Sequence, residues 1–209
     1  MPQLLSVNIA TEVRTGDWTG DVGATGIDKR GVPQRVRIFD DHVDGDHVMD
    51  TTHHGGPYKA VYAYSHEDAM WWETKIGRGL PPGSFGENLT TAGLDINHAR
   101  IGERWRIGTV VLQVTEPRIP CRVFAGFWER PHLVREFTEA GRSGTYLRII
   151  EAGEVRAGDR IVVISRPDHD VTVATAFAAR TGTGPARASL RAAYDDFPPK
   201  WQAWVDAGN

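Results

Sequence analysis

Residues 104–115 read RWRIGTVVLQVT, and this stretch decides the fold class that the sequence predicts. Trp105 and Ile107 alternate with arginines before a Gly-Thr pair, and apolar residues recur at every second position after it. Because a period of two is typical of a strand, two such runs joined by a short glycine-containing turn predict a β-hairpin. The second strand leads directly into residues 115–122, TEPRIPCR, which hold the only cysteine of the chain.

Cys121 is presented from a stiff stretch of backbone. Residues 117–121 read PRIPC, and each proline fixes its own φ and biases the residue before it toward an extended conformation. Arg118 and Arg122 flank the thiol, and nearby positive charge favours the thiolate, which is both the nucleophile and the soft-metal ligand. The alternative is an inert cysteine packed like a small hydrophobic side chain, and the residues alone leave both interpretations open.

The composition of the 209-residue chain is that of an ordinary globular protein, with 40% hydrophobic and 24% charged residues. Its net charge of −3 does not indicate a basic surface for nucleic acid or an anionic membrane, so we expect neither partner. An anionic ligand would need a local basic site. A single cysteine cannot form an internal disulfide. No apolar run approaches about 18 residues, and the start, MPQLLSVN, lacks the regions of a signal peptide. We therefore expect a cytoplasmic protein.

Periodicity along the chain predicts a β-rich α+β body followed by a helical tail. Alternating or continuous apolar runs predict strands at residues 4–10, 34–39, 60–64, 104–115, 145–150 and 160–165. Turn-rich segments separate the last two strands, at residues 151–154 and 157–159. Capping and stop signals predict helices at residues 65–77, 123–127 and 133–141. From residue 171 onward the pattern is that of three short helices, so we expect two domains, residues 1–165 and 166–209.

Residues 40–54 are predicted to form a loop that is rich in ionisable side chains. The loop contains five aspartates and four histidines, which are common ligands of divalent metals, but their spacings fit no standard structural zinc site. It leads into His-Gly-Gly-Pro at 54–57, where two glycines permit a close approach of the backbone to a ligand. The residues alone leave open which side chains of the loop act as ligands, and the candidates are His42, Asp44, Asp46, His47, Asp50, His53 and His54.

Three further residues have both a functional and a purely structural interpretation. Lys29, in Gly-Ile-Asp-Lys, is either a site residue or an exposed surface lysine. Asn88 lies in an irregular Gly/Pro-rich segment, residues 80–89, where an asparagine commonly caps a turn. Arg142 lies in Gly-Arg-Ser-Gly, which either cradles an anion with its backbone amides or forms the exit of a helix.

Four motifs then occur in order, and together they carry a family resemblance. They are HGGPYKAV at 54–61, FGENLT at 85–90, PRIPC at 117–121 and Gly-Asp at 158–159. This set resembles the MOSC family, named for the C-terminal domain of molybdenum cofactor sulfurases, and within it the stand-alone YiiM type with a C-terminal three-helix domain. The resemblance spans nearly the whole chain. The chain is too short to hold a sulfurase-type aminotransferase domain as well, so pyridoxal phosphate is not expected.

The resemblance implies a barrel-like β body that holds a molybdenum cofactor through the single cysteine. Cys121 would supply a thiolate to the metal, which is reasonable because soft metals prefer sulfur ligands. The implied activity is the reduction of N-hydroxylated compounds, such as hydroxylaminopurine-type base analogues, with electrons from a separate reductase. In this interpretation the pterin-borne metal carries the redox step and the protein supplies orientation and electrostatics.

The resemblance also implies roles for individual residues. Lys29, Asp46 and His54 match the family's pocket positions. Lys29 and His54 would deliver protons or bind an anion, and Asp46 would orient or charge-balance one of them. Contacts with the pterin and phosphate of the cofactor are expected from Asn88, Arg118 and Arg142.

Other functions remain open at this point. A carrier of the cofactor or of sulfur would need the same reactive thiol in a basic pocket, without turnover of a substrate. A cysteine hydrolase would use Cys121, His54 and Asp46 as a triad, but the chain lacks a nucleophile-elbow or papain-like signature. A purely structural interaction protein would not explain why the PRIPC and HGGP motifs occur together.

Overall fold

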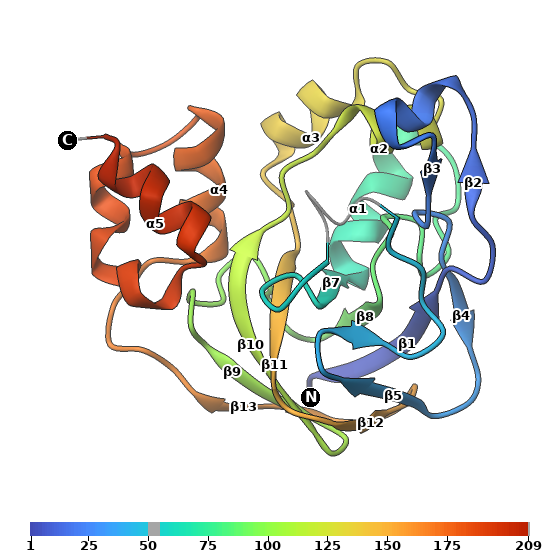
Figure 1. Ribbon diagram of the computed structural model, residues 1–209, viewed down its shortest axis with the longest axis horizontal. Coiled ribbons are helices and arrows are strands. Elements are labelled where there is room, and N and C mark those ends of the chain that lie inside the picture. Colours follow the sequence, from blue (N-terminus) through green and yellow to red (C-terminus); the bar gives the residue numbers. More distant parts are fainter. Residues whose placement is uncertain (50–54, 209) are drawn as a thin grey trace.

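The computed structural model describes residues 1–49 and 55–208, and its main feature is a mixed sheet of eight strands (Figure 1). In spatial order the strands run β13-β9-β10-β11-β7-β8-β1-β4. The pair β7 and β8 is parallel, and the other neighbouring pairs of this sheet are antiparallel. The strands are β1 (Gln3–Ile9), β4 (Arg30–Val32), β7 (Val61–Ser65), β8 (Leu89–Ala92), β9 (Arg104–Ile107), β10 (Val110–Pro117), β11 (Thr145–Glu151) and β13 (Ile161–Ser165).

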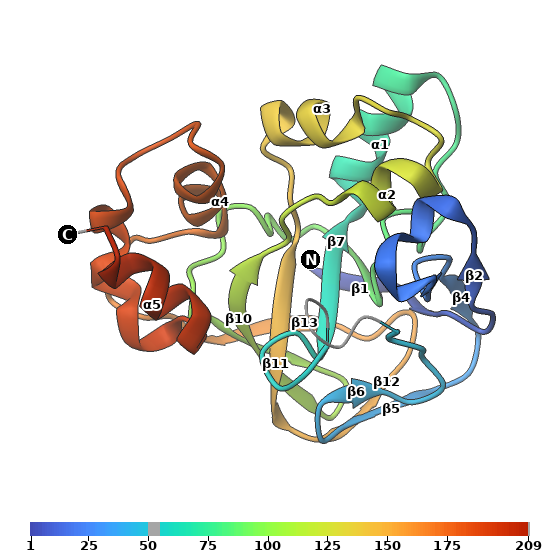
Figure 2. The ribbon, with the colours of Figure 1, turned by 45° about the horizontal axis from the view of Figure 1, so that its top comes forward.

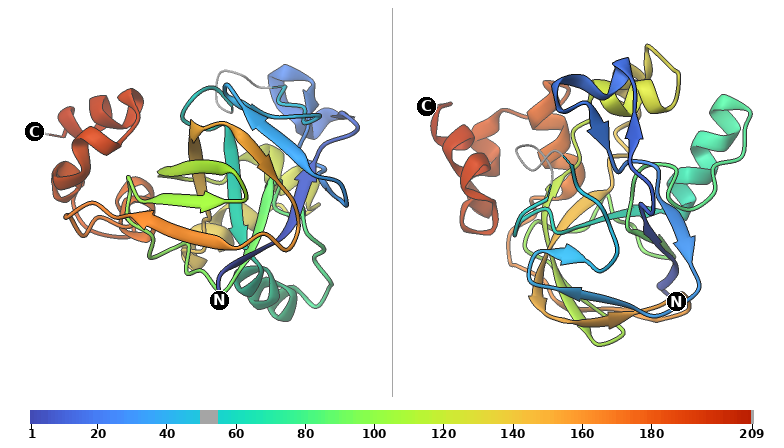
Figure 3. Two further views of the ribbon diagram at one scale, coloured as in Figure 1. Left: turned by 90° about the horizontal axis from the view of Figure 1, so that it is seen from below. Right: turned by 45° about the vertical axis from the view of Figure 1, so that its right-hand side comes forward.

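The sheet curls back on itself without forming a closed barrel in the described part of the chain (Figure 3). Gln3, at the start of β1, forms an isolated bridge with Arg160, directly before β13. Beside this bridge the N–H of Leu4 donates to the carbonyl oxygen of Asp159 at 2.9 Å. The predicted β-rich α+β class is confirmed, and a short contact rather than a continuous ladder holds the barrel-like curvature.

The predicted hairpin lies within this sheet and forms its most buried part. Ile107 of β9 pairs with Val110 of β10, and Trp105 pairs with Leu112. Every residue of β10 is buried, because β9 and β11 pair with its two edges and the helix α4 (Val173–Thr181) packs on it. The strand ends at Pro117, so the chain reaches Cys121 four residues after leaving a rigid element.

Two smaller sheets extend the body. One contains β12 (Gly153–Val155), β5 (Val36–Phe39) and β6 (His42–Val43), and the other contains β2 (Arg14–Thr15) and β3 (Ala24–Thr25), with the 3-10 helix η1 (Asp17–Val22) between these two strands. Two predictions are therefore wrong in part. The segment 40–54 is not an uninterrupted loop, because it contains β6, and the turn predicted at 151–154 runs into β12. Gly153 enters the strand because a Cβ at this position would lie 2.4 Å from Thr109 Oγ1, a distance that only glycine avoids.

The helix α1 (His66–Ile76) begins and ends where its capping signals predict. The Ser65 hydroxyl oxygen accepts a hydrogen bond from the N–H of Asp68 at 3.1 Å. Gly77 ends the helix with a φ of 70°, and its N–H donates to the carbonyl oxygen of Glu73 at 2.8 Å. Such caps satisfy backbone groups that have no partner within the helix.

Replacing the Ser65 cap should have a measurable effect on stability. We expect Ser65→Ala to lower the free energy of unfolding by about 1 kcal/mol, because an N–H at the start of α1 loses its acceptor. The control is Thr74→Ala, an exposed position in the same helix where alanine is the better helix former. Urea denaturation measures both variants, and an equal loss in the two would contradict the capping role.

The helices α1, α2 and α3 lie on the same side of the body (Figure 2), and an aromatic core beneath them anchors the segment that follows Cys121. The latter two helices are α2 (Arg122–Phe127) and α3 (Leu133–Ala140). Phe124 of α2 packs edge-on against Phe137 of α3, with ring centroids 5.3 Å apart, and Trp72 of α1 stacks on Phe137 at 5.8 Å. Because these rings are fully buried, the start of α2 is fixed relative to the sheet.

The tail forms the three predicted helices, although the second has 3-10 geometry. They are α4 (Val173–Thr181), η2 (Arg187–Asp196) and α5 (Pro199–Asp206). Leu190 and Trp201 belong to the same hydrophobic core as Trp105 and Val114 of the sheet, so the tail packs directly on the body. The domain boundary at residue 166 stays a prediction. Within residues 1–49 and 55–208, no helix has the length and apolar character needed to cross a membrane.

Candidate functional site

A pocket lies where the chain leaves β10 and enters α2. Its wall combines polar groups and aromatic rings from segments that are far apart in the sequence. The polar side chains that matter for its chemistry are Lys29, Asp46, Lys59, Asn88, Arg118 and Cys121. The sequence predicts all of these as site residues except Lys59.

Cys121 occupies the N-cap position of α2, with an extended backbone at φ −131° and ψ 169°. Its carbonyl oxygen accepts a hydrogen bond from the N–H of Ala125 at 3.2 Å. The residue is half-buried and lines the pocket beside Val123. This placement favours an accessible thiol over the inert, fully buried cysteine that the sequence left open.

Lys29 and Asp46 form a buried ion pair in the pocket wall. Lys29 is only 6% exposed, so its interpretation as a surface lysine is wrong. Its ammonium donates to both carboxylate oxygens of Asp46. Burial lowers the pKa of Lys29 because it penalises the charged form, and the Asp46 carboxylate opposes this shift. A buried ammonium with a lowered pKa is well suited to donating a proton.

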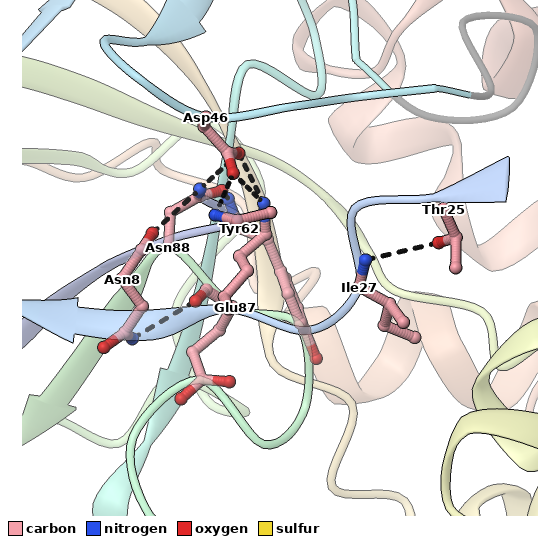
Figure 4. Close-up of polar contacts among 9 residues, drawn as sticks. Asn8, Thr25, Ile27, Asp46, Tyr62, Glu87 and Asn88 are labelled. Atoms are coloured by element: carbon pink, nitrogen blue, oxygen red, sulfur yellow. Dashed lines mark hydrogen bonds and ion pairs between the residues drawn. The ribbon is translucent and has the colours of Figure 1, made fainter. Parts of the chain in front are cut away.

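Asn88 connects two residues of the pocket wall, Asp46 and Tyr62, to Asn8 of β1 behind it, as Figure 4 shows. Its Nδ2 donates to Asp46 Oδ2 at 2.8 Å and to the carbonyl oxygen of Asn8 at 3.3 Å. Its Oδ1 accepts from the N–H of Tyr62 at 3.1 Å. Asp46 is further held by the N–H of Ala10, which donates to Oδ1 at 2.8 Å. Asn88 therefore positions Asp46, and its predicted contact with a pterin stays a prediction.

Glu87, which the sequence did not single out, shapes the loop beside Lys29. Its Oε1 accepts from the N–H of Gly83 at 2.6 Å and from Thr90 Oγ1 at 2.7 Å. Its Oε2 accepts from the N–H of Phe85 at 3.0 Å. Burial raises the pKa of Glu87, and these hydrogen bonds oppose the shift. Gly83 has a φ of +93°, and a Cβ there would lie 2.2 Å from the carbonyl oxygen of Lys29, so glycine permits this close packing.

Arg118 is a buried cation between aromatic rings. Its guanidinium carbon lies 4.3 Å from the ring centroid of Phe124 and 5.3 Å from that of Tyr62. Its Nη1 donates to the carbonyl oxygen of Phe85 at 2.9 Å. Among the residues that the structure describes, cation–π contacts and a backbone acceptor stabilise this charge and no carboxylate pairs with it. Its positive potential contributes to the pocket.

Two tyrosines form the aromatic part of the wall. The rings of Tyr62 and Tyr146 have centroids 5.2 Å apart. Burial raises the pKa of Tyr146 to about 12 and raises that of Tyr62 further, and Arg118 opposes both shifts. Both phenols are therefore neutral at physiological pH. Cys121 lies close enough to Arg118 and Tyr146 to interact with each electrostatically.

Arg142 is not brought to this pocket. Its guanidinium pairs with Asp68, and its carbonyl oxygen accepts from the hydroxyl of Tyr64 at 3.0 Å. It lines a separate hollow that also contains Asn97 and His98. Gly141 ends α3 with a φ of 65°, so this segment is a helix exit. The buried Asp68 carboxylate takes up the charge of Arg142 away from the Cys121 pocket, and the expected contact of Arg142 with the cofactor stays a prediction.

The structure separates the candidates of the 40–54 loop. Asp46 lies in the pocket wall, whereas Asp44 is exposed and does not line the pocket. His47 lines the pocket. His53 and His54 lie outside the described residues, so the proton-delivery role expected of His54 stays a prediction. In the parts of the chain that the structure describes, no three His, Cys, Asp or Glu side chains are grouped to hold a metal ion.

Lys59 is the pocket cation that the sequence analysis missed. Its Nζ lies 3.4 Å from Glu116 Oε1 and 5.3 Å from the ring centroid of Tyr146. The residue belongs to the HGGPYKAV motif, so the signal was present but was attributed to the histidine and the glycines.

Comparison with known proteins gives the family of this chain. A family model described as the MOSC domain matches residues 50–162, which is more than half of the chain. The chain belongs to the MOSC domain family. The uncharacterized protein YflK of Bacillus subtilis is 35% identical over 170 residues, which cover 81% of this chain and 76% of that protein. The crystal structure of YiiM from Geobacillus stearothermophilus has a TM-score of 0.82 and 26% identity, with coverage of 99% and 98%.

A relative named as a reductase is also similar. This protein of Gibberella moniliformis is 30% identical over 122 residues, which cover 54% of this chain but only 21% of the relative's own length. In this chain the matched MOSC region supplies Lys59, Asn88, Arg118 and Cys121 to the pocket. Lys29 and Asp46 precede the matched region, so the N-terminal segment completes the site of this MOSC protein.

Proposed function

We propose that this chain is a molybdenum-cofactor-dependent reductase of N-hydroxylated compounds, such as hydroxylaminopurine-type base analogues. The observation that carries the proposal is the Cys121 thiol in a pocket walled by buried cations and neutral tyrosines. Membership of the MOSC family and similarity to a protein named as a reductase support the oxidoreductase class. The N-hydroxylated substrate comes from the YiiM-type resemblance.

The residues present fit a molybdenum cofactor. A thiolate is a preferred ligand of soft metals, and Cys121 is the only residue of the chain that can supply one. Tyr62 and Tyr146 offer flat, neutral surfaces of the kind against which an aromatic ring system packs. Arg118 and Lys59 supply positive charge for a phosphate in a chain that is acidic overall.

When bound, the cofactor would supply two-electron chemistry at the metal, with electrons delivered by a separate reductase. The overall change is cleavage of the N–O bond of R–NHOH by two electrons and two protons, which gives R–NH2 and water. Cys121 would hold the cofactor and the aromatic wall would exclude water. The Lys29 ammonium would place a proton near the leaving hydroxyl oxygen, and Asp46, fixed by Asn88, would orient that ammonium.

Lys29→Gln tests the proton-delivery role. An amide can still donate a hydrogen bond to Asp46 but carries no transferable proton, so we expect kcat to fall by about a hundredfold. The cofactor content of the purified protein should stay at the wild-type level. Single-turnover reduction kinetics and metal analysis measure the two quantities. Unchanged kcat with unchanged content would remove Lys29 from the proton path.

The proposal as a whole is tested by a reduction assay. The protein is purified from a host that makes the cofactor, reduced with an artificial electron donor and given 6-hydroxylaminopurine, and the amino product is quantified. Turnover that requires the cofactor supports the reductase. Stoichiometric cofactor without turnover of any N-hydroxylated compound would favour the cofactor or sulfur carrier instead. The hydrolase interpretation gains no support, because the Asp46 carboxylate is already bound to Lys29, Asn88 and Ala10.

A further inference from the structure

Glu87 is a buried carboxylate that the proposed reaction does not use. It is 2% exposed, and it lies behind the pocket wall rather than in its lining. Figure 4 shows its carboxylate pointing away from Asp46. Among the described residues no lysine or arginine forms an ion pair with it, and its hydrogen-bond partners are backbone N–H groups and a hydroxyl. Burying a charge without a direct counter-ion costs stability, and such residues occur at functional sites.

The groups that contact this carboxylate in the described part of the chain all donate hydrogen bonds. The N–H groups of Gly83 and Phe85 donate at 2.6 and 3.0 Å, and the Thr90 hydroxyl donates at 2.7 Å. Thr90 Oγ1 also accepts from Asn8 Nδ2 at 2.9 Å, so its own proton is left for Glu87. A protonated Glu87 would add a further donor among these donors, so the network requires the ionised form.

A tight turn connects Glu87 to both buried cations of the pocket. Phe85, whose N–H donates to Glu87, accepts from Arg118 Nη1 at 2.9 Å with its carbonyl oxygen. Gly83, whose N–H also donates to Glu87, packs against the backbone of Lys29, where a Cβ would lie 2.2 Å from the lysine carbonyl oxygen. The carboxylate therefore fixes the backbone on which the positions of Lys29 and Arg118 depend.

Glu87 also supplies a negative charge behind these cations. Lys29 and Arg118 are 6% and 4% exposed, and Asp46 binds only the first of them while sharing its oxygens with two other donors. With Glu87 the two buried cations are balanced by two buried anions. Burial lowers the pKa of Lys29, and the charge of Glu87 opposes this shift together with that of Asp46.

We propose that Glu87 is a positioning residue of this site, whose buried carboxylate holds Lys29 and Arg118 through the turn in front of it and serves as their second counter-charge. This inference rests on the proposed function, in which the Lys29 ammonium places a proton near the leaving hydroxyl oxygen. Asp46 orients that ammonium, and Glu87 favours its protonated form without touching it.

Asp46 and Glu87 are the carboxylates whose charges act on Lys29. Its neighbours in the sequence, Asp28 and Arg30, form an ion pair with each other at 2.7 Å. The other ionisable groups of the pocket wall are His47, Lys59, Tyr62, Arg118, Tyr146 and Cys121. All of these groups are kept in a Glu87 variant, so a change in the titration of Lys29 reports on Glu87 itself.

The experiment measures Lys29 directly in the cofactor-free full chain. The chain contains only four lysines, at positions 29, 59, 75 and 200, so NMR of protein labelled with carbon-13 at lysine Cε gives a simple spectrum. The Lys29 signal is assigned by its loss in Lys29→Gln. Glu87→Gln removes the charge and keeps the size of the side chain, and thermal unfolding verifies that the variant is folded.

Two control variants separate charge from packing. Glu73→Gln removes another carboxylate that accepts from a backbone N–H of the same segment, that of Leu80 at 2.6 Å, but does not line the pocket. Thr90→Val removes the hydroxyl that donates to Glu87 and keeps the charge of Glu87. Both controls should leave the titration of Lys29 as it is in the wild type.

In Glu87→Gln the pKa of Lys29 should be lower than in the wild type, because one of the two charges that oppose burial is gone. A proton donor must be protonated to act, so in the loaded protein the alkaline limb of the kcat profile should move to lower pH. On that limb kcat should fall by about tenfold, a part of the roughly hundredfold or larger contribution of a general acid. In the Lys29→Gln background, Glu87→Gln should leave the pH profile unchanged.

Three results would overturn the inference. The first is the same titration of Lys29 in Glu87→Gln as in Glu73→Gln and the wild type. The second is a shift in Thr90→Val as large as that in Glu87→Gln, because packing would then explain both. The third needs no variant of Glu87 to fold: the carboxyl carbon-13 signal of Glu87 in the wild type would show the protonated form at neutral pH.

These outcomes are distinct from failure of the proposed function. The titrations use cofactor-free protein, so a wild type without turnover of N-hydroxylated compounds leaves them unaffected. Conversely, a reductase in which Lys29 titrates independently of Glu87 would keep the proposed function and lose this inference.

Discussion

Asp46→Ala should lower the free energy of unfolding by about 3–5 kcal/mol, the range for removing one partner of a buried ion pair. The Lys29 and Asp46 side chains are only 7% and 5% exposed, so water cannot replace the lost carboxylate. The variant also deprives Asn88 Nδ2 and the N–H of Ala10 of their acceptor. Chemical denaturation at neutral pH measures the loss.

The matched control is Asp44→Ala, which removes an exposed carboxylate of the same loop and should change stability by less than about 0.5 kcal/mol. The pH dependence gives a second readout. Because burial lowers the pKa of Lys29 in the folded chain, the unfolded chain binds more protons between the folded and unfolded pKa values, and stability rises with pH across that window. Without Asp46 nothing opposes the effect of burial on the pKa of Lys29 as strongly, so the pH range between its folded and unfolded pKa values widens. The loss in free energy of unfolding caused by Asp46→Ala should therefore be smaller at alkaline pH than at neutral pH. Equal losses for the two alanine variants would contradict the buried pair.

Cys121→Ser should abolish retention of the molybdenum cofactor and with it all reductase turnover. Serine has nearly the shape of cysteine, but its hydroxyl is a poor ligand for a soft metal, whereas a thiolate is a preferred one. The backbone at Cys121 is extended and its carbonyl oxygen, not its thiol, begins the hydrogen bonding of α2. The fold should therefore be intact, with a free energy of unfolding within about 1 kcal/mol of wild type.

Arg122→Gln is the control for this variant, because Arg122 is the exposed neighbour of Cys121 and does not line the pocket. It should keep wild-type molybdenum and pterin content. Content is measured by elemental analysis and by the fluorescence of the oxidised pterin in the same preparations. Wild-type content in folded Cys121→Ser would show that the thiol is not needed to hold the cofactor.

The sequence predicted those parts of the fold whose signals are local. The hairpin at 104–115 and the cap at Ser65 each depend on residues a few positions apart, and both are confirmed. β8 was missed because residues 80–89 are rich in glycine and proline, and its pairing with β7 on one edge and β1 on the other makes residues 89–92 a strand. Pairing of that kind depends on tertiary contacts rather than on local propensity.

The site residues likewise divide into those with a local sequence signal and those that depend on distant contacts. Cys121 was found because prolines and arginines mark it within five residues, and the structure places it at the pocket. The choice between Asp44 and Asp46 needed the position of Lys29, 17 residues away from Asp46 in the chain. The pairing of Arg142 with Asp68 could not be predicted either, because Asp68 lies 74 residues earlier. Burial and pairing at such separations are set by the fold, so no spacing rule could have supplied them.

The most direct test of the central claim is X-ray absorption at the molybdenum edge of the loaded wild-type protein, compared with the isolated cofactor in solution. The account predicts that the metal in the wild-type protein has one more sulfur neighbour than the metal in the isolated cofactor, because the Cys121 thiolate is a ligand. Identical sulfur coordination in the two samples would contradict it.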